Sequence, residues 1–122
     1  MDNNPVGWFE IYVQDMARAR AFYEGVFEGK LQKMESVAEL WAFPMSRDGT
    51  GSAGALIRMP GFPSGQNSVI VYFRCQDCGV EEDRVKRLGG RVEKPKMRIG
   101  EHGFVSLVYD TEGNMIGLHS MK

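Results

Sequence analysis

The sequence has few cysteines, no excess of charge of one sign and no long apolar run. Its 122 residues include two cysteines, with 15 basic and 16 acidic residues and a formal net charge of -1. Two cysteines cannot build a disulfide framework, and balanced charge offers no basic face for nucleic acid. No apolar run approaches the roughly 20 residues of a membrane-spanning helix. We therefore expect neither a nucleic-acid partner nor a membrane partner.

Targeting signals are also missing from the sequence. Residues 1–5 have neither the basic nor the apolar region of a signal peptide, so we expect a cytoplasmic protein. Apolar residues make up 43% of the chain and charged residues 25%, which is typical of a globular domain. The length is sufficient for one hydrophobic core without covalent staples.

The two cysteines form a C-x-x-C pair, Cys75 and Cys78. Such a pair at the start of a helix can be redox active, because the helix dipole lowers a thiol pKa. It is also half of a zinc site, with no second pair to complete it. We favour a structural interpretation, in which Cys75 ends a strand, Asp77 caps a helix and Cys78 lies in its first turn.

Hydrophobic periodicity predicts the elements of the first half. Residues 6–13 alternate between apolar and other side chains with a period of two, which indicates a strand. Asp15 is a good N-cap, and residues 16–27 carry an apolar stripe of helical spacing. Strands follow over 30–37, 40–45 and 54–59, the last two joined by a glycine-rich turn.

The second half repeats this order after residues 60–67, whose turn-forming composition predicts a linker. We expect a strand over 68–75, a helix capped by Asp77 and ended by Gly89, a short strand over 91–94 and a loop over 95–101. Two final strands, 104–109 and 115–119, flank a turn over 110–114.

The two halves have the same internal spacing. Asp15 and Asp77 are 62 residues apart, and so are the turn glycines Gly51 and Gly113. Equal spacing of caps and turns indicates a tandem repeat. The sequence thus predicts an α+β domain of two βαβββ modules, residues 6–59 and 68–120.

Three segments of this repeat resemble a known family. Residues 15–23 fit a first-helix signature D-x-x-R-A-x-x-F-Y, residues 88–90 fit the end of a second helix, and residues 110–116 resemble a D-P-x-G-N hairpin. In this order they resemble the glyoxalase/bleomycin resistance/dioxygenase superfamily, also called vicinal oxygen chelate proteins. The resemblance implies a cup-shaped mixed sheet, a small-molecule ligand and a homodimer.

Metal-dependent members of that family place a histidine, glutamate or glutamine on each of four strands. In this sequence the corresponding positions fall on Trp8, Val71, Ala55 and Gly117. None of these side chains binds a metal ion. We therefore expect no metal of the standard kind and no cofactor, with a divalent metal at an atypical site as the alternative.

Strand alternation predicts which side chains line the cup. We expect the ligand-binding residues to be Trp8, Tyr12, Ile57, Val71, Phe73 and Gly117. Together with Glu10 and His119, they predict an apolar, aromatic pocket that holds one carboxylate and one imidazole.

Three residues in or near this pocket are candidate catalytic groups. A carboxyl group among apolar neighbours, such as Glu10, suits general acid or base chemistry, with His119 as its partner or as an atypical metal ligand. His102 lies in a glycine-flanked loop that is suited to cover the cup. The structural alternatives are an ion-paired or solvated Glu10 and two surface histidines.

Two functions of different classes follow. In the first, the chain is a metal-independent binding module for a small apolar or aromatic molecule, similar to the drug-sequestering branch of the family. In the second, it is a lyase, isomerase or dioxygenase that uses Glu10 with His119 or His102. The four positions without metal ligands favour the first.

Overall fold

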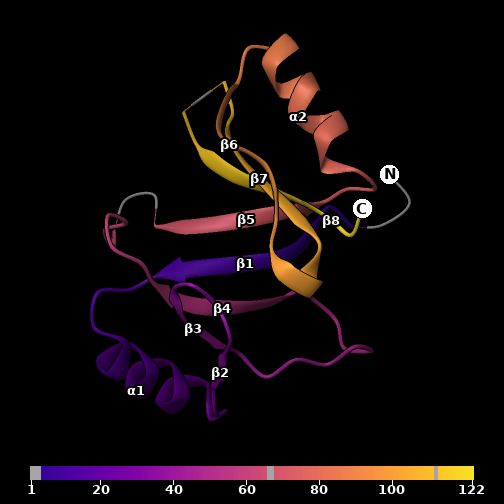
Figure 1. Cartoon of the computed structure of the whole chain (residues 1–122). Helices are drawn as coiled ribbons and strands as arrows, with labels where there is room; N and C mark the ends of the chain where they lie inside the picture. The colour runs from indigo at the N-terminus through magenta and orange to yellow at the C-terminus, as the bar shows by residue number, and fades with distance from the viewer. Residues whose placement is uncertain (1–3, 66–67, 112) are drawn as a thin grey trace. The chain divides into compact units, whose positions relative to one another are not determined.

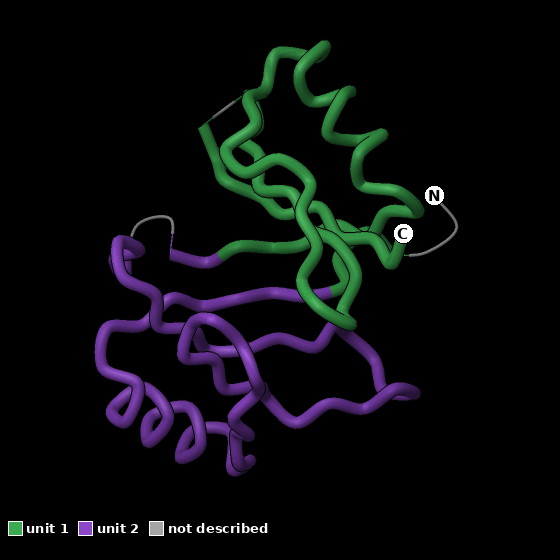
Figure 2. The backbone as a smooth tube through the Cα atoms, in the orientation of Figure 1, with its two compact units in different colours: residues 1–7, 70–122 green, residues 8–69 purple. Residues whose placement is uncertain are grey.

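A computed structural model describes residues 4–65, 68–111 and 113–122. The chain divides into two compact units, shown in Figure 2: unit 1 comprises residues 1–7 and 70–122, and unit 2 comprises residues 8–69. Residues 66–67 of the expected linker and residue 112 of the expected turn lie outside the described residues. In the described part of the chain, neither helix has the length and apolar character needed to cross a membrane.

Unit 2 contains the first helix and four strands. These are β1 (Val6–Tyr12), which starts in unit 1, α1 (Met16–Phe27), β2 (Gln32–Met34), β3 (Glu39–Ala42) and β4 (Ala53–Arg58). The strand order is β2-β3-β4-β1, with β1 parallel to β4 and the other pairs antiparallel.

Helix α1 begins and packs as the sequence predicts. The Asp15 carboxylate accepts a hydrogen bond from the Arg18 amide at 3.0 Å, which satisfies one of the amides that a helix start leaves open. One side of the helix packs against the sheet of unit 2 (Figure 1), where Met16 joins Val13 and Leu56 in a buried cluster. This cluster is the hydrophobic core of unit 2.

Unit 1 repeats the pattern. Its elements are β5 (Val69–Arg74), α2 (Cys78–Arg87), β6 (Arg91–Arg98), a 3-10 turn (Gly100–His102), β7 (Phe104–Tyr109) and β8 (Met115–Ser120). The order β5-β8-β7-β6, with β5 parallel to β8, is the order of unit 2 again. Cys78, Val108 and Leu118 form its buried cluster under α2.

The predicted α+β fold of two βαβββ modules is confirmed. The short strand over 91–94 and the loop after it are wrong, because β6 continues to Arg98. Pro95 suggested a loop, but β6 is paired only with β7 among the described strands and shows register shifts on either side of Lys94. A proline is tolerated on such an edge strand, because its missing N–H faces away from the ladder.

In each module the first and last strands are paired, and an aromatic ring on the first strand lies over a glycine on the last. Phe9 pairs with Gly54, and Tyr72 pairs with Gly117. A Cβ atom built on either glycine would overlap that ring. The absence of a side chain at these two positions therefore allows the strands to pair with the rings in place.

Substitution at the first of these glycines tests this packing. We expect Gly54→Ala to lower the free energy of unfolding by about 1–3 kcal/mol, because the Phe9 ring must move from its place over Gly54. Gly25→Ala is the matched control, since Gly25 lies in α1 with no heavy atom within 4 Å of the added Cβ. It should raise the free energy of unfolding by about 0.5–1 kcal/mol. Urea denaturation measures both, and equal effects of the two substitutions would contradict the packing argument.

Candidate functional site

A buried carboxylate on β1 is held by its neighbours on the same face of the strand. The Trp8 indole N–H donates to Glu10 Oε2 at 3.2 Å, and the Tyr12 hydroxyl donates to Glu10 Oε1 at 3.4 Å. The three residues share a face because side chains two apart on a strand point the same way. Glu10 is only 8% exposed, so its charge lies away from bulk water. We call these three residues the Glu10 row.

Small and apolar residues of β4 lie beside the Glu10 row. Ala55 pairs with Glu10 and Ile57 pairs with Tyr12, and both β4 residues are buried. The Phe62 ring stacks on the Tyr12 ring, with centroids 5.0 Å apart. Trp8 is only half-buried, which makes it the more accessible end of the row. The alternation predicted for β1 is confirmed, because Ile11 and Val13 pack on the α1 side instead.

The carboxylate also changes the acidity of its neighbour. Burial, followed by the charge of Glu10 and the hydrogen bond to it, raises the pKa of Tyr12 above the ordinary value of 10.0. A phenol in this setting stays protonated and acts as a hydrogen-bond donor. Tyr12 is therefore a positioning group for the carboxylate, with no base role near neutral pH.

The expected direction of Phe73 is wrong. Its side chain packs against the buried cluster under α2, and Val71, two residues earlier, lies on the same face of β5. The opposite face carries Ile70 and Tyr72, which are 2% and 8% exposed. Every position from Val69 to Phe73 is apolar or aromatic, so the sequence of β5 has no alternation to fix its facing.

Tyr72 is a residue of this face that the sequence reasoning missed. It pairs with Gly117, and its ring takes the space that any side chain at Gly117 would need. The repeat contained the signal, because Tyr72 stands 62 residues after Glu10, the same spacing that separates the helix caps. The two modules thus place a carboxylate and a phenol ring at equivalent positions.

The two candidate histidines meet in unit 1. His119 Nε2 lies 2.6 Å from the backbone carbonyl of His102, in the 3-10 turn before β7. A carbonyl only accepts hydrogen bonds, so Nε2 is the donor in this contact. This contact fixes the ring of His119, and it involves only the backbone of His102.

The residues at the four family metal positions do not fit a metal ion. The Trp8 indole is a hydrogen-bond donor to Glu10, and Ala55 is fully buried without a ligand atom. Gly117 has no side chain and lies under the Tyr72 ring, and Val71 is apolar and lies on the other face of β5. Among the residues that the structure describes, no three histidine, cysteine, aspartate or glutamate side chains gather as a metal site would require. We derive no metal-dependent step from this arrangement.

The cysteine pair has the surroundings of structural thiols. Asp77 caps α2 by accepting from the Gly79 amide at 3.0 Å, and Cys78 is fully buried in the first turn. Burial, and then the charge and hydrogen bond of Glu81, raise the pKa of Cys75 to about 11. A redox-active cysteine needs the opposite shift. The structural interpretation of the pair is the one these surroundings favour.

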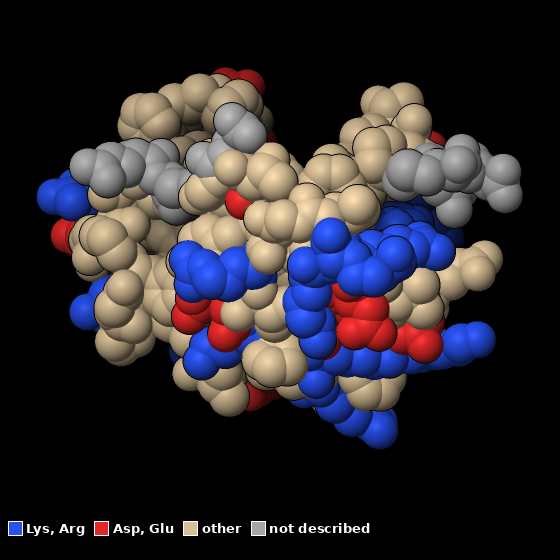
Figure 3. All heavy atoms as spheres, turned by 90° about the horizontal axis from the view of Figure 1, so that it is seen from above, with Lys and Arg blue, Asp and Glu red and all other residues tan. Residues whose placement is uncertain are grey.

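Charged residues of both signs lie side by side on the face shown in Figure 3. On α2, Arg84 pairs with Glu81 at 3.7 Å and Lys86 with Asp83 at 3.5 Å. Pairs three residues apart on an exposed helix are worth a few tenths of a kcal/mol. Each of these pairs therefore adds little to the stability of α2.

Several solved structures have this fold. A hypothetical protein from Bacillus halodurans C-125 matches with a TM-score of 0.72 and 14% identity, covering 96% of this chain and 94% of the other. A methylmalonyl-CoA epimerase variant from Streptomyces coelicolor, in complex with 2-nitronate-propionyl-CoA, matches with a TM-score of 0.70 and 15% identity over 96% of each chain. The methylmalonyl-CoA epimerase from Mycobacterium tuberculosis matches at 0.68 and 15%, over 97% of this chain and 88% of that one. At such identity the likeness shows the fold alone.

A sequence profile gives the second comparison. The profile described as "Glyoxalase/Bleomycin resistance protein/Dioxygenase superfamily" matches residues 6–118. None of the curated proteins compared with the chain matches it.

The shifted pKa of Tyr12 predicts a dependence of stability on alkaline pH. Above about pH 10 the unfolded chain loses the phenolic proton while the folded chain keeps it, so the free energy of unfolding falls as pH rises. Tyr12→Phe should remove this part of the slope, and Glu10→Gln should reduce it, because burial alone then raises the pKa. Urea unfolding between about pH 9 and pH 11 measures the slopes. Identical slopes in all three proteins would refute the assignment to Tyr12.

The thiols predict a difference in alkylation rate. A pKa of about 11 at Cys75, against the ordinary 9.0, leaves about a hundredfold less thiolate, and Cys78 is fully buried. We expect iodoacetamide at about pH 8 to modify the folded protein at least tenfold more slowly than the urea-unfolded chain. Cys75→Ser and Cys78→Ser separate the two sites by mass spectrometry. Rapid modification of either thiol in the folded protein would contradict this expectation and support a redox-active pair.

Proposed function

Because the chain belongs to the glyoxalase/bleomycin resistance protein/dioxygenase superfamily, we propose that it binds a small apolar or aromatic organic molecule without the metal ion of the family's metal enzymes. The observation that carries the proposal is the Glu10 row. A carboxylate that is 8% exposed and held by two aromatic donors has a fixed position in an apolar setting. Burying a charged group lowers the stability of the fold, and such groups cluster at functional sites. Glu10 is therefore a candidate for ligand binding.

The Glu10 row also defines the chemistry of the ligand. A carboxylate only accepts hydrogen bonds, so the ligand carries a donor for Glu10. Trp8, Tyr12 and Ile57 supply aromatic and apolar surface on the same face of the sheet, which suits a flat or branched carbon skeleton. Trp8 is the half-buried end of the row, and the ligand enters from that end.

The proposal extends the sequence prediction for unit 2 and leaves part of it out. Trp8, Tyr12 and Ile57 remain proposed ligand-binding residues, with Glu10 as the polar anchor. Phe73 and Val71 do not, since that face of β5 packs toward α2. The CoA compound bound by the Streptomyces coelicolor epimerase is a property of that protein, and at 15% identity it names no ligand here.

Native mass spectrometry of protein purified without chelators tests the proposal. We expect a metal-free homodimer that retains an organic molecule, since members of this superfamily commonly bind small molecules as dimers. Glu10→Gln keeps the shape of the side chain but removes its charge, and should weaken retention by at least tenfold, as expected for the loss of a charged hydrogen bond.

A second glutamate provides the matched control. The Trp41 indole donates to Glu39 Oε2 at 3.3 Å, the same kind of contact two residues apart, but Trp41 packs on the α1 side of the sheet. Glu39→Gln should therefore leave retention unchanged. Equal losses in both variants would overturn the role of Glu10. One divalent ion per subunit, lost in Glu10→Gln or His119→Ala, would instead support the enzyme hypothesis with an atypical metal site.

A further inference from the structure

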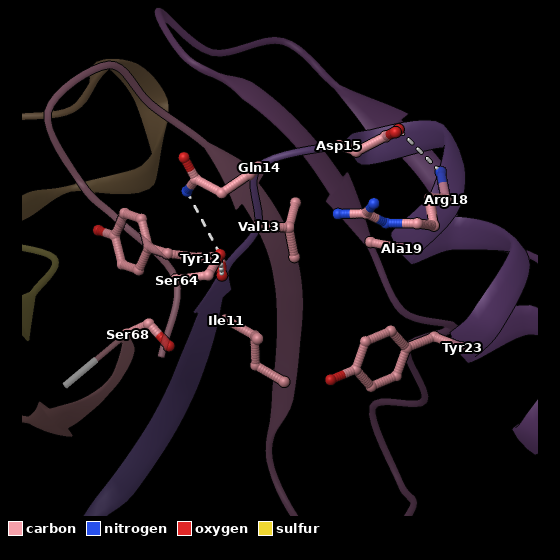
Figure 4. A pocket seen from close by; sticks show the side chains of 10 residues that line it. All are labelled: Ile11, Tyr12, Val13, Gln14, Asp15, Arg18, Ala19, Tyr23, Ser64 and Ser68. Atoms are coloured by element: carbon pink, nitrogen blue, oxygen red, sulfur yellow. Dashed lines mark hydrogen bonds between the residues drawn. The ribbon is translucent and has the colours of Figure 1, made fainter. Parts of the chain in front are cut away.

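A concave site lies in unit 2, where β1 ends and α1 begins. Its volume is about 320 Å³, at the lower end of the range for small-molecule sites. Ile11, Val13 and Ala19 form an apolar lining, and Arg18 and Tyr23 line it from α1 (Figure 4). We call this space the α1 cavity.

Two polar groups face the α1 cavity without a protein partner. In the part of the chain that the structure describes, the Arg18 side chain makes no ion pair or hydrogen bond, and only its backbone amide is used, by Asp15. The Tyr23 ring is fixed by contacts with Phe22, Phe27 and Phe43, while its hydroxyl makes no hydrogen bond among the described residues. Figure 4 shows the guanidinium and the hydroxyl both pointing from α1 toward Ile11 and Val13.

These groups favour a particular ligand chemistry. A guanidinium presents a planar fork of donors that matches a carboxylate bidentately, and a phenol adds a third donor. The apolar residues between the groups favour a ligand with a hydrocarbon part over a bare inorganic anion. The Asp15 carboxylate also borders the cavity, with its Oδ1 accepting from the Arg18 amide as the cap of α1.

We propose that the α1 cavity is a binding site for a small organic carboxylate, with Arg18 pairing the carboxylate and the Tyr23 hydroxyl donating beside it. This site is separate from the one proposed at Glu10. Ile11 and Val13 lie on the α1 side of β1, whereas Glu10 lies on the opposite face, and only Tyr12 borders both. The two sites also differ in charge, since one offers a cation and the other a carboxylate.

Backbone NMR titration of the full chain with benzoate tests this site. We expect saturable shifts of the amides of residues 11–23, and benzamide, the neutral isostere, should bind at least tenfold more weakly. Arg18→Gln should weaken benzoate binding at least tenfold, and Tyr23→Phe about threefold. Shifts confined to other parts of the chain, or equal affinity for benzoate and benzamide, would overturn the proposal.

Two controls separate this result from non-specific attraction of anions. Arg47→Gln makes the same charge change in unit 2 at an exposed arginine outside the α1 cavity, and should leave benzoate affinity unchanged. A loss in Arg47→Gln equal to that in Arg18→Gln would show general charge attraction and refute the site. Inorganic phosphate at the same concentration should compete weakly, and phosphate binding tighter than benzoate would overturn the assignment to a carboxylate.

Discussion

The parallel pairing of the first and last strands of each module is the constraint on which the rest of this structure depends. In unit 2 it sets Glu10 opposite Ala55, and in unit 1 it sets Tyr72 opposite Gly117. Parallel strands at this spacing can keep a large ring on one strand only if the neighbouring position on the other is small. Phe9 over Gly54 and Tyr72 over Gly117 meet this condition, on the helix side in one module and on the opposite side in the other. The packing of these rings and glycines therefore fixes which side chains of the paired strands point toward the helix and which point away from it.

That facing gives unit 2 its two chemically different surfaces. At an odd-numbered position of β1, Ile11 packs against the cluster under α1, and the even-numbered positions bring Trp8, Glu10 and Tyr12 into one row. A slip of one residue in the register would turn Glu10 into the apolar cluster under α1, away from Trp8 and Tyr12. Burying the carboxylate without these donors would lower the free energy of unfolding by several kcal/mol. The position of the carboxylate thus depends on the same register that builds the core.

Much of this was predictable from the sequence, because the determining signals are local and strong. Asp15 and Asp77 start both helices, Gly113 turns the last hairpin with a φ of 83°, and the alternation of β1 places Glu10 correctly. The facing of β5 was not predictable from its own residues, since an apolar run carries no period of two. The extension of β6 through Pro95 was missed because its tolerance depends on the strand being at an edge, which is a property of the sheet. The α1 cavity depends on side-chain packing across a loop, and no pattern of residue types encodes it.

The repeat clarifies why two equivalent positions carry different chemistry. Glu10 and Tyr72 occupy the same place in their modules, and each lies opposite a small residue of the last strand. The neighbours two residues from Glu10 are Trp8 and Tyr12, and both donate to its carboxylate. The neighbours two residues from Tyr72 are Ile70, which has no side-chain donor, and Arg74. A buried carboxylate needs hydrogen-bond donors beside it, whereas a buried aromatic ring needs a small residue on the neighbouring strand. In the first module the donors on either side of Glu10 hold the buried carboxylate, and in the second module the Tyr72 ring at the equivalent position fills the space over Gly117.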